Sequence, residues 1–412
     1  MTTPLALVVQ LYRPEGGWAD VGRLEHRDET TWFSTFSSYW DDPGRPVLGQ
    51  VFEERGPTWR PVAAVALPDW FSHLLPEGRL RQAIAEDAHV NPAREFFLLA
   101  RVGGDDLPGG LRVVAAEPES TLHTPEPAVP GTPGPEPDVG PYKFSLAGVQ
   151  LKFSVLEGER GLTVPARGEA GDWIAKLPDL RGFDGVPQAE LAGLELARSA
   201  GIDAADARLV PVSSIAGLPT WVAESGGEAL LIRRFDRTPD GGRVHFEEAA
   251  QVLELPTGRD KFKYGTNFET IAKVTAALAG PEAVGDVIDR IVLNVLVGNG
   301  DAHAKNWAYR YVDGHTPTLS PAYDIVPTVL YVANENLGPK LAGSRSFDDV
   351  TIAKFRRLAR VGGWDEAAGV ARASEAVHRV VEAWPALADH LPAESYEQLT
   401  ARRDDLPLVR SA

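Results

Sequence analysis

The pattern of apolar and polar residues at the start of the chain predicts a small mixed unit. The run LALVVQLY, residues 5–12, is typical of a strand. The segment LPDWFSHLLPEGRLRQAIAE, residues 67–86, carries apolar residues at helical spacing and is interrupted by Pro76. The segment REFFLLARVGGDDLPGGLRVV, residues 94–114, predicts a helix, a glycine-rich turn and a strand. We therefore expect residues 1–116 to form an α+β subdomain.

A change in composition follows this unit. Residues 117–141, EPESTLHTPEPAVPGTPGPEPDVGP, are dense in proline and almost free of large apolar side chains. Such a composition is typical of a stiff, extended linker. We place the main domain boundary of the chain here.

Strand patterns dominate residues 142–245. Four segments predict strands: YKFSLAGVQLKFSVLE, DWIAKLPDL, ARLVPV and EALLIRRFDR. Between them, QAELAGLELARSAGI, residues 188–202, predicts a helix closed by Gly201, a residue type common just after a helix end.

From about residue 246 the pattern becomes helical. Residues 286–297, DVIDRIVLNVLV, place five apolar side chains on one stripe of a helix: Ile288, Ile291, Val292, Val295 and Leu296. The tail, residues 351–410, is also predicted to be helical. The fold class is thus α+β, with a strand-rich lobe over 142–245 and a mainly helical lobe over 246–412.

The composition argues against several classes of protein and site. The 412 residues carry a net charge of −17, which argues against unaided, non-specific nucleic-acid binding. The absence of cysteine excludes disulfides, thiolate zinc sites and a cysteine nucleophile. The first residues read as a strand rather than a signal peptide, and no run approaches the roughly 18 apolar residues of a membrane span. We expect a cytoplasmic protein.

Polar chemistry is concentrated after the helix over residues 286–297. In LVGNGDAHAKNW the apolar run ends at Gly298, and Asp301 and Asn306 follow with four residues between them. This is the D-x-x-x-x-N spacing of a kinase catalytic loop, although the pair is also common in ordinary turns. Further on, LSPAYDIVPT places Asp324 within an apolar segment, where a carboxylate needs a partner such as Mg²⁺.

An anion site is predicted upstream. Lys176 interrupts the strand WIAK, and Glu190 lies in the helix that follows. A strand lysine paired with a helix glutamate orders the phosphates in kinases. A surface lysine with an extended stem is the simpler alternative for Lys176 taken alone. Gly148, in SLAGVQLKF, is compatible with a phosphate-capping turn and with a plain hairpin.

Taken together, these segments resemble the HipA-type serine/threonine kinases of bacterial toxin–antitoxin modules over nearly the whole chain. FSLAGVQLKF is similar to the family's phosphate loop, WIAKLP to its lysine strand and LLIRRFDR to its hinge. LVGNGDAHAKNW and LSPAYDIVPT are similar to its catalytic and metal motifs. The resemblance implies a two-lobed, protein-kinase-like fold.

The resemblance also implies roles for individual residues. Asp301 would be the catalytic base, Asn306 and Asp324 would hold magnesium, and Glu190 would form the structural ion pair with Lys176. Ser145 matches the serine on which these kinases autophosphorylate, which ejects the loop and stops activity. The implied ATP-binding positions are Ala147, Gly148, Val149, Gln150, Leu151, Lys152, Lys176, Arg233, Arg234, Phe235, His303, Tyr323 and Asp324. The chain departs from the family at Arg233, where the hinge commonly has an acid.

By resemblance, the chain is expected to be an ATP- and Mg²⁺-dependent toxin kinase. Its partners would be a HipB-like helix-turn-helix antitoxin and an aminoacyl-tRNA synthetase substrate, with DNA reached only through the antitoxin. Two alternatives remain open: a pseudokinase that acts as a corepressor, and a small-molecule or lipid kinase. A metal hydrolase is disfavoured, because the nine histidines form no H-E-x-x-H pair.

Overall fold

The computed structural model describes residues 5–104, 106–116, 151–159, 161–165, 170–178, 183–224, 226–257 and 264–412. The predicted linker, Ser145 and the positions from Ala147 to Gln150 lie outside these ranges. In the part of the chain that is described, no helix is long and apolar enough to cross a membrane.

The N-terminal subdomain is built on an antiparallel sheet of five strands in the order β4-β3-β2-β1-β5. Alternate residues of β1 face the core, where Leu7, Val9 and Leu11 are buried. The strands are β1 (Leu5–Tyr12), β2 (Trp18–Arg27), β3 (Thr30–Thr35), β4 (Val62–Ala64) and β5 (Leu111–Ala115). The helices are α1 (Ser37–Trp40), α2 (Gln50–Arg55), α3 (Asp69–Ser72), α4 (Gly78–Asp87) and α5 (Glu95–Val102). The strands and helices predicted for this region are confirmed.

The second unit is a six-stranded sheet in the order β10-β7-β6-β8-β11-β9. Its strands are β6 (Lys152–Gly158), β7 (Gly161–Thr163), β8 (Trp173–Lys176), β9 (Ala207–Pro211), β10 (Ile215–Ala216) and β11 (Glu228–Arg233). Helix α6 (Val186–Ser199) follows β8, and two short helices, η3 (Val212–Ser214) and α7 (Thr220–Ala223), lie beyond β9. Gly201 takes the left-handed conformation just after α6, with φ +72°, as its place in the sequence predicted.

The third unit is mainly helical, but it also contains a sheet that the helical pattern did not predict. Strands β12 (His245–Glu248), β13 (Ala308–Tyr311) and β14 (Pro317–Leu319) pair in that order. The α-helices in the described part of this unit are α8 (Ala249–Val252), α10 (Phe268–Ala279), α11 (Val284–Val297), α12 (Lys354–Val361), α13 (Glu366–Ala383), α14 (Ala393–Asp405) and α15 (Pro407–Arg410). Short 3₁₀ helices are η4 (Pro281–Ala283), η5 (Ala304–Asn306), η6 (Thr328–Leu330), η7 (Phe347–Asp349) and η8 (Trp384–Asp389).

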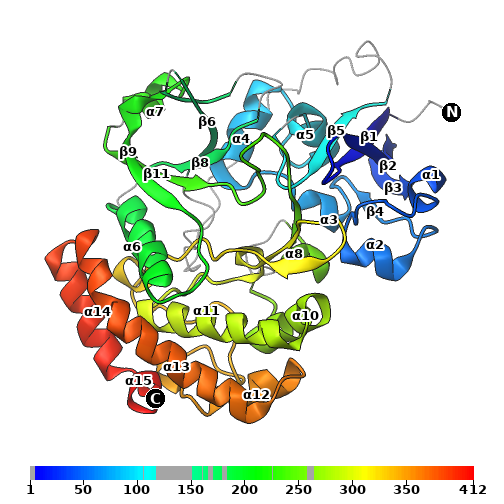
Figure 1. The fold of residues 1–412 in the computed structure, drawn as a ribbon. Helices are drawn as coiled ribbons and strands as arrows, with labels where there is room; N and C mark the ends of the chain where they lie inside the picture. The colour runs from blue at the N-terminus through cyan, green and yellow to red at the C-terminus, as the bar shows by residue number, and fades with distance from the viewer. Residues whose placement is uncertain are drawn as a thin grey trace.

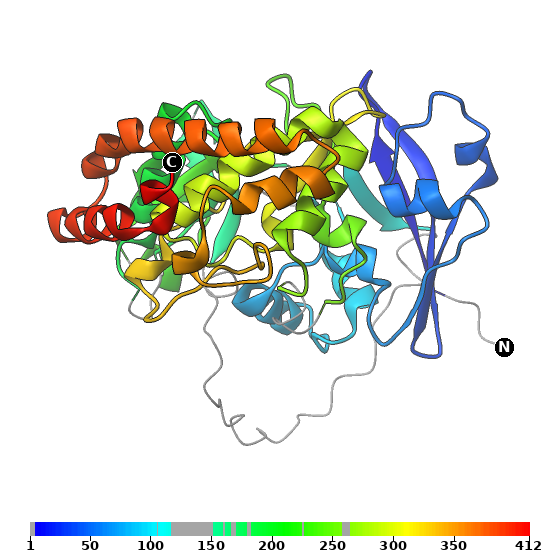
Figure 2. The same cartoon turned by 90° about the horizontal axis from the view of Figure 1, so that it is seen from below.

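The arrangement of the units confirms the mixed α+β prediction. The six-stranded sheet lies above the helical unit, and α6 lies beside the C-terminal helices (Figure 1). The N-terminal sheet lies at the end of the molecule opposite α14 (Figure 2). Strand β12 spans the expected boundary between residues 245 and 246 and pairs with β13 of the helical unit.

The N-terminal subdomain is joined to the helical unit by buried polar contacts. The Glu247 carboxylate accepts hydrogen bonds from the Gln50 backbone N–H at 2.8 Å, the Trp70 indole at 3.1 Å and the Tyr311 hydroxyl at 2.5 Å. Burial raises the pKa of Glu247 to about 6. A buried carboxylate is costly without hydrogen-bond donors. The three hydrogen bonds to Glu247 therefore favour one fixed position of the N-terminal subdomain on the helical unit.

Candidate active site

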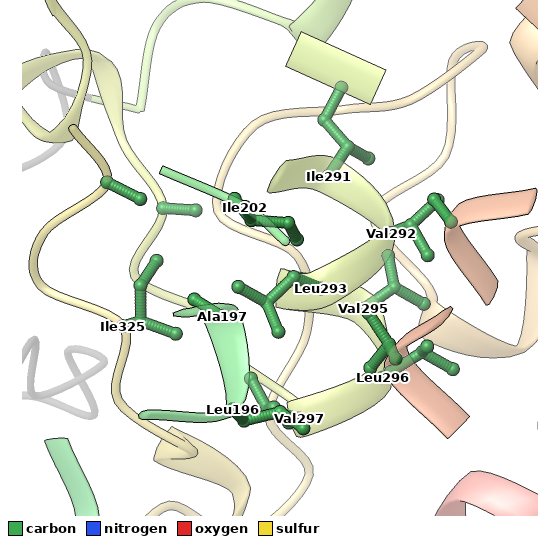
Figure 3. Close-up of a cluster of buried hydrophobic side chains, with 14 of the residues drawn as sticks. Leu196, Ala197, Ile202, Ile291, Val292, Leu293, Val295, Leu296, Val297 and Ile325 are labelled. Atoms are coloured by element: carbon green, nitrogen blue, oxygen red, sulfur yellow. The ribbon is translucent and has the colours of Figure 1, made fainter. Parts of the chain in front are cut away.

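Helix α11 carries the candidate catalytic loop and is buried on every side. The five residues predicted to form one apolar stripe are all inaccessible, but so are Val287, Leu293 and Val297. The prediction of a single buried stripe is therefore too narrow, because the C-terminal part of α6, the segment at Ile325 and the C-terminal helices surround α11 (Figure 3). Such packing holds the loop that follows the helix in one position.

Gly298 ends α11 at a point where only glycine fits. Its φ of +74° lies in the left-handed region. A Cβ atom at this position would lie 2.5 Å from a methyl group of Val329. The chain therefore turns sharply out of the helix at Gly298, and the polar residues that follow begin one residue later.

Asn299 connects the loop after α11 to the segment that carries Asp324 through hydrogen bonds. Its side-chain N–H group donates to Asn294 Oδ1 at 2.8 Å and to the Asp324 carbonyl at 3.0 Å. Its Oδ1 accepts from the Asp301 backbone N–H at 3.0 Å. The sequence analysis did not single out Asn299, and its position between two glycines in GNGD is the only local signal.

The carboxylate of Asp301, in the loop after α11, is in contact with two side chains. The Tyr264 hydroxyl donates to Oδ1, and the His303 Nε2 atom lies 3.9 Å from the same oxygen. The Asn306 side chain donates to the Asp301 carbonyl at 2.9 Å. The loop therefore brings Asp301 and Asn306 together, as expected from their spacing. His303 lies beside them, and Tyr264, which sequence reasoning missed, reaches Asp301 from outside the loop.

Lys176, Glu190 and Asp324 form a buried ionic cluster. The Lys176 side chain is 4% exposed, so the alternative of a surface lysine is wrong. Its Nζ lies 2.5 Å from Glu190 Oε1 and also donates to Asp324 Oδ1. Lys152, on β6, lies 3.8 Å from Asp324 Oδ2. The strand lysine and helix glutamate are thus paired, and Asp324 has the cationic partners that its apolar setting requires.

The charges in this cluster shift the pKa values of its members. Burial lowers the pKa of Lys176, but the two carboxylates outweigh burial and the pKa is raised. Burial raises the pKa of Glu190 more than Lys176 lowers it. Although burial acts in the opposite direction, Lys152 and Lys176 hold the pKa of Asp324 well below its usual range. Asp324 is therefore an anion that two lysines neutralise.

Helix α6 approaches the Asp324 segment more closely than any side chain would allow. A Cβ atom on Gly193 would lie 2.2 Å from the Ile325 carbonyl oxygen and 3.0 Å from its Cγ2. Glu190, which pairs with Lys176, lies one turn earlier on the same helix. Asp324 itself has φ +54°, a conformation that is uncommon for residues other than glycine and frequent at functional sites.

The three predicted hinge positions, Arg233 to Phe235, point their side chains to different partners. Phe235 and Tyr323 are in ring contact at 5.5 Å between centroids, next to Asp324. The Arg233 guanidinium lies over the Trp173 ring at 5.2 Å and 3.8 Å from Asp172. Arg234 is directed away from the ionic cluster and forms ion pairs with Asp106 at 2.6 Å and Asp236 at 2.9 Å. Its guanidinium therefore binds Asp106 of the N-terminal subdomain, and its backbone N–H donates to the Asp172 carbonyl at 3.0 Å.

The donor groups at the site suit a magnesium–nucleotide complex. A small cavity is lined by Asn299, Asn306, Tyr323 and Asp324, among others. The Asn306 amide nitrogen donates to the Asp301 carbonyl, which leaves the amide oxygen as a ligand atom, and Asn306 and Asp324 line the same cavity. Carboxylate and amide oxygens are ligands that suit Mg²⁺, which usually keeps several waters and binds substrate phosphates.

The catalytic loop also contacts the N-terminal subdomain, which sequence reasoning did not anticipate. Lys305 Nζ lies 2.6 Å from the carboxylate of Glu77, at the start of α4, and 3.8 Å from that of Glu248. Tyr323 donates to the Lys305 carbonyl at 2.7 Å. Lys305 is thus bound by groups from three places: the start of α4, β12 and the segment of Tyr323. No local pattern pairs a residue of α4 with the loop, since they are 228 positions apart.

Comparisons with known proteins identify the family models and relatives that the chain matches. A model of the HipA-like C-terminal domain matches residues 144–387, and a model of the HipA N-terminal domain matches residues 17–114. A Sinorhizobium fredii protein, Y4dM, provisionally described as a kinase, is 38% identical over 375 residues, which cover 89% of each chain. A second protein of the same organism and description, Y4mE, is 30% identical, over 78% of this chain and 77% of its own.

The toxin kinase HipA of Shewanella oneidensis is more distant. It is described as a serine/threonine-protein kinase toxin and is 24% identical over 71% of this chain and 70% of its own. The HipA, HipB and operator DNA complex from that organism matches in fold, with a TM-score of 0.70, 19% identity and 98% coverage of both chains.

Proposed function

The chain belongs to the HipA-like family, and from this premise we propose that it is an ATP- and Mg²⁺-dependent serine/threonine protein kinase. One observation carries the proposal. Lys176, Glu190 and Asp324 meet in one buried ionic cluster, and Asn299 ties the Asp301 loop to the Asp324 backbone. These are the residue types that hold a nucleotide and orient an acceptor in kinases.

The roles of the residues follow from their chemistry. Lys176 binds the nucleotide phosphates, and Asn306 and Asp324 hold the metal through oxygen atoms. Bound Mg²⁺ would neutralise charge on the phosphates. Asp301 accepts the proton of the acceptor hydroxyl, and the fixed helix α11 keeps the carboxylate in position. Phe235 and Tyr323 flank the site on the hinge side, where the backbone of residues 233–235 would meet the base.

Asp301→Asn tests the proposed base. The change is nearly isosteric, and the amide oxygen can still accept from Tyr264, so the fold and ATP binding should survive. Transfer of the γ-phosphate should fall by about two or more orders of magnitude, the scale of general-base loss. Asp404→Asn, on the exposed surface of α14, is the matched control and should transfer normally. A well-folded Asp301→Asn protein that transfers phosphate near the wild-type rate would reject Asp301 as the base.

At the level of the cell, we propose a growth-inhibiting toxin that is neutralised by a helix-turn-helix antitoxin. The family membership and the fold shared with the HipA of the HipB–operator complex support this proposal. An aminoacyl-tRNA synthetase, glutamyl-tRNA synthetase in particular, is the proposed substrate. Expression without an antitoxin should arrest growth for wild type and not for Asp301→Asn, and radiolabelled phosphate should appear on the synthetase only with wild type.

Self-inhibition at Ser145 is a further part of the proposal. A phosphate adds roughly −1.5 to −2 charges, and beside the nucleotide phosphates that charge repels ATP. Incubation with ATP should yield a singly phosphorylated, inactive protein. Mass spectrometry should map the phosphate to Ser145, and Ser145→Ala should remain active for longer. A phosphate at another position, or unchanged activity after modification, would contradict this regulation.

A further inference from the structure

The backbone and the ring of Tyr264 are contacted by residues 338–345, which lie outside the loop that carries Asp301. The Arg345 guanidinium donates to the Tyr264 carbonyl at 3.0 Å. The ring packs on Gly338, where a Cβ atom would lie 3.2 Å from Tyr264 Cε1.

The ring and the hydroxyl of Tyr264 both reach the proposed base. The ring meets the imidazole of His303 edge to face, with 5.6 Å between centroids. The hydroxyl donates a hydrogen bond to Asp301 Oδ1. An aliphatic hydroxyl on an acceptor must make this same type of contact, because it gives its proton to the Asp301 carboxylate during transfer.

We propose that the Tyr264 hydroxyl stands in the place of the acceptor hydroxyl and competes with it, and with water, for Asp301. The inference rests on the proposed function, since it takes Asp301 as the base. While the phenol donates to Asp301 Oδ1, that oxygen is not open to the hydroxyl of an acceptor or to water. Tyr264 therefore limits the hydrolysis of ATP by water until an acceptor displaces the phenol hydroxyl from Asp301.

Removal of the hydroxyl should expose this competition. In Tyr264→Phe the ring contacts with His303 and Gly338 remain, but the hydroxyl that donates to Asp301 Oδ1 is gone. A water molecule that fills the space of this hydroxyl can donate to the same oxygen. That water can attack the γ-phosphorus of ATP: an oxygen–phosphorus bond forms, the bond to the β,γ-bridging oxygen breaks, and ADP leaves. The water's proton passes to Asp301 and then to solvent, so the products are ADP and phosphate.

The test measures phosphate release from Mg·ATP by the full-length protein without any protein acceptor. Tyr264→Phe should hydrolyse ATP about tenfold faster than wild type, the order expected for one hydrogen bond to a charged group. The KM for ATP should stay within about twofold of wild type, because phenylalanine keeps the ring contact with His303. Tyr396→Phe, a tyrosine of α14 far from Asp301, is the matched control and should behave as wild type. Asp301→Asn combined with Tyr264→Phe should abolish the gain.

Three results would overturn the inference. Hydrolysis by Tyr264→Phe at or below the wild-type rate would mean that the phenol positions Asp301 rather than competing for it. Phosphotyrosine at position 264 in the wild type, found by mass spectrometry, would make the residue an acceptor. A gain that persists in the double variant would mean that Asp301 is not involved. Failure of the proposed function gives a different result, since the protein would then show no Mg·ATP-dependent rise in melting temperature and no phosphate transfer at all.

Discussion

Lys176 and Asp324 form an ion pair although 148 positions separate them in the chain. The lysine comes from β8 of the six-stranded sheet, and the aspartate from the segment after β14 in the helical unit. Glu190 completes the cluster from α6. Because Lys176 and Glu190 are withdrawn from water, the cluster is stable only when all of its members are in place. A nucleotide with its metal would enter a site whose charges are already arranged.

The first prediction concerns nucleotide binding. A ligand that binds only the folded state raises the free energy of unfolding, by about 2.7 kcal/mol at a concentration one hundred times the Kd. Mg·ATP should therefore raise the melting temperature of wild type, and excess EDTA should cancel the metal-dependent part. Asp324→Ala should show a much smaller rise, and Asp404→Ala a normal one. Equal shifts for Asp324→Ala and wild type would remove Asp324 from the site.

The second prediction concerns the close approach of α6. In an open helix, Gly→Ala stabilises by about 1 kcal/mol. At Gly193 the added Cβ would lie 2.2 Å from the Ile325 carbonyl oxygen, so α6 or the Asp324 segment must move. Gly193→Ala should lower the melting temperature and weaken ATP binding, measured by calorimetry. Retained affinity together with raised stability would show that this contact does not set the geometry of the cluster.

The third prediction concerns the link between the N-terminal subdomain and the catalytic loop. Lys305 lies 2.6 Å from Glu77 and precedes Asn306 directly. Glu77→Gln and Lys305→Met should each slow phosphate transfer, with little change in the Kd for ATP. The double variant should be no slower than Lys305→Met alone, because both changes break one interaction. Glu282→Gln, at an exposed position on η4, is the control. Additive losses in the double variant would mean that the two residues act independently.

The fourth prediction concerns stability in acid. The imidazole of His73 is buried, with Nε2 2.8 Å from the Leu255 carbonyl. Burial, with a smaller effect of Lys305, lowers the pKa of His73 to about 4 from an ordinary 6.5. The neutral form is thus favoured in the fold. The stabilisation is complete above pH 6.5 and is lost as the pH falls toward 4, at about 1.4 kcal/mol per pH unit.

His73→Gln isolates this effect, because glutamine can donate to the same carbonyl but does not ionise in this range. Between pH 7 and pH 5, the free energy of unfolding of wild type should fall by about 2 kcal/mol more than that of the variant. Denaturant titrations at each pH measure the difference. The comparison of variants is needed because Glu247, whose pKa burial raises to about 6, changes stability in the opposite direction. Parallel pH profiles would show that His73 is not held neutral.

Local sequence pattern predicted the elements on which the site is built. The strand around Lys176, the helix that carries Glu190 and the helix that ends at Gly298 were each identified from apolar periodicity and a glycine stop. The loop spacing from Asp301 to Asn306 was also informative, because residues this close must share one turn. Periodicity was weaker for β12 and β14, which are only four and three residues long. Their pairing with β13 depends on partners far away in the chain.

The sequence by itself determined the strand of Lys176, the helices of Glu190 and Gly298 and the polar residues that interrupt or follow them, since these depend on neighbours within a few positions. The tertiary structure decided which of those polar residues meet. It paired Lys176 with Asp324, joined Glu77 to Lys305, turned the guanidinium of Arg234 toward Asp106 and placed Tyr264 on Asp301. The physical reason is that a buried charge or hydroxyl must find a partner, but the partner can come from any segment that packing brings within reach.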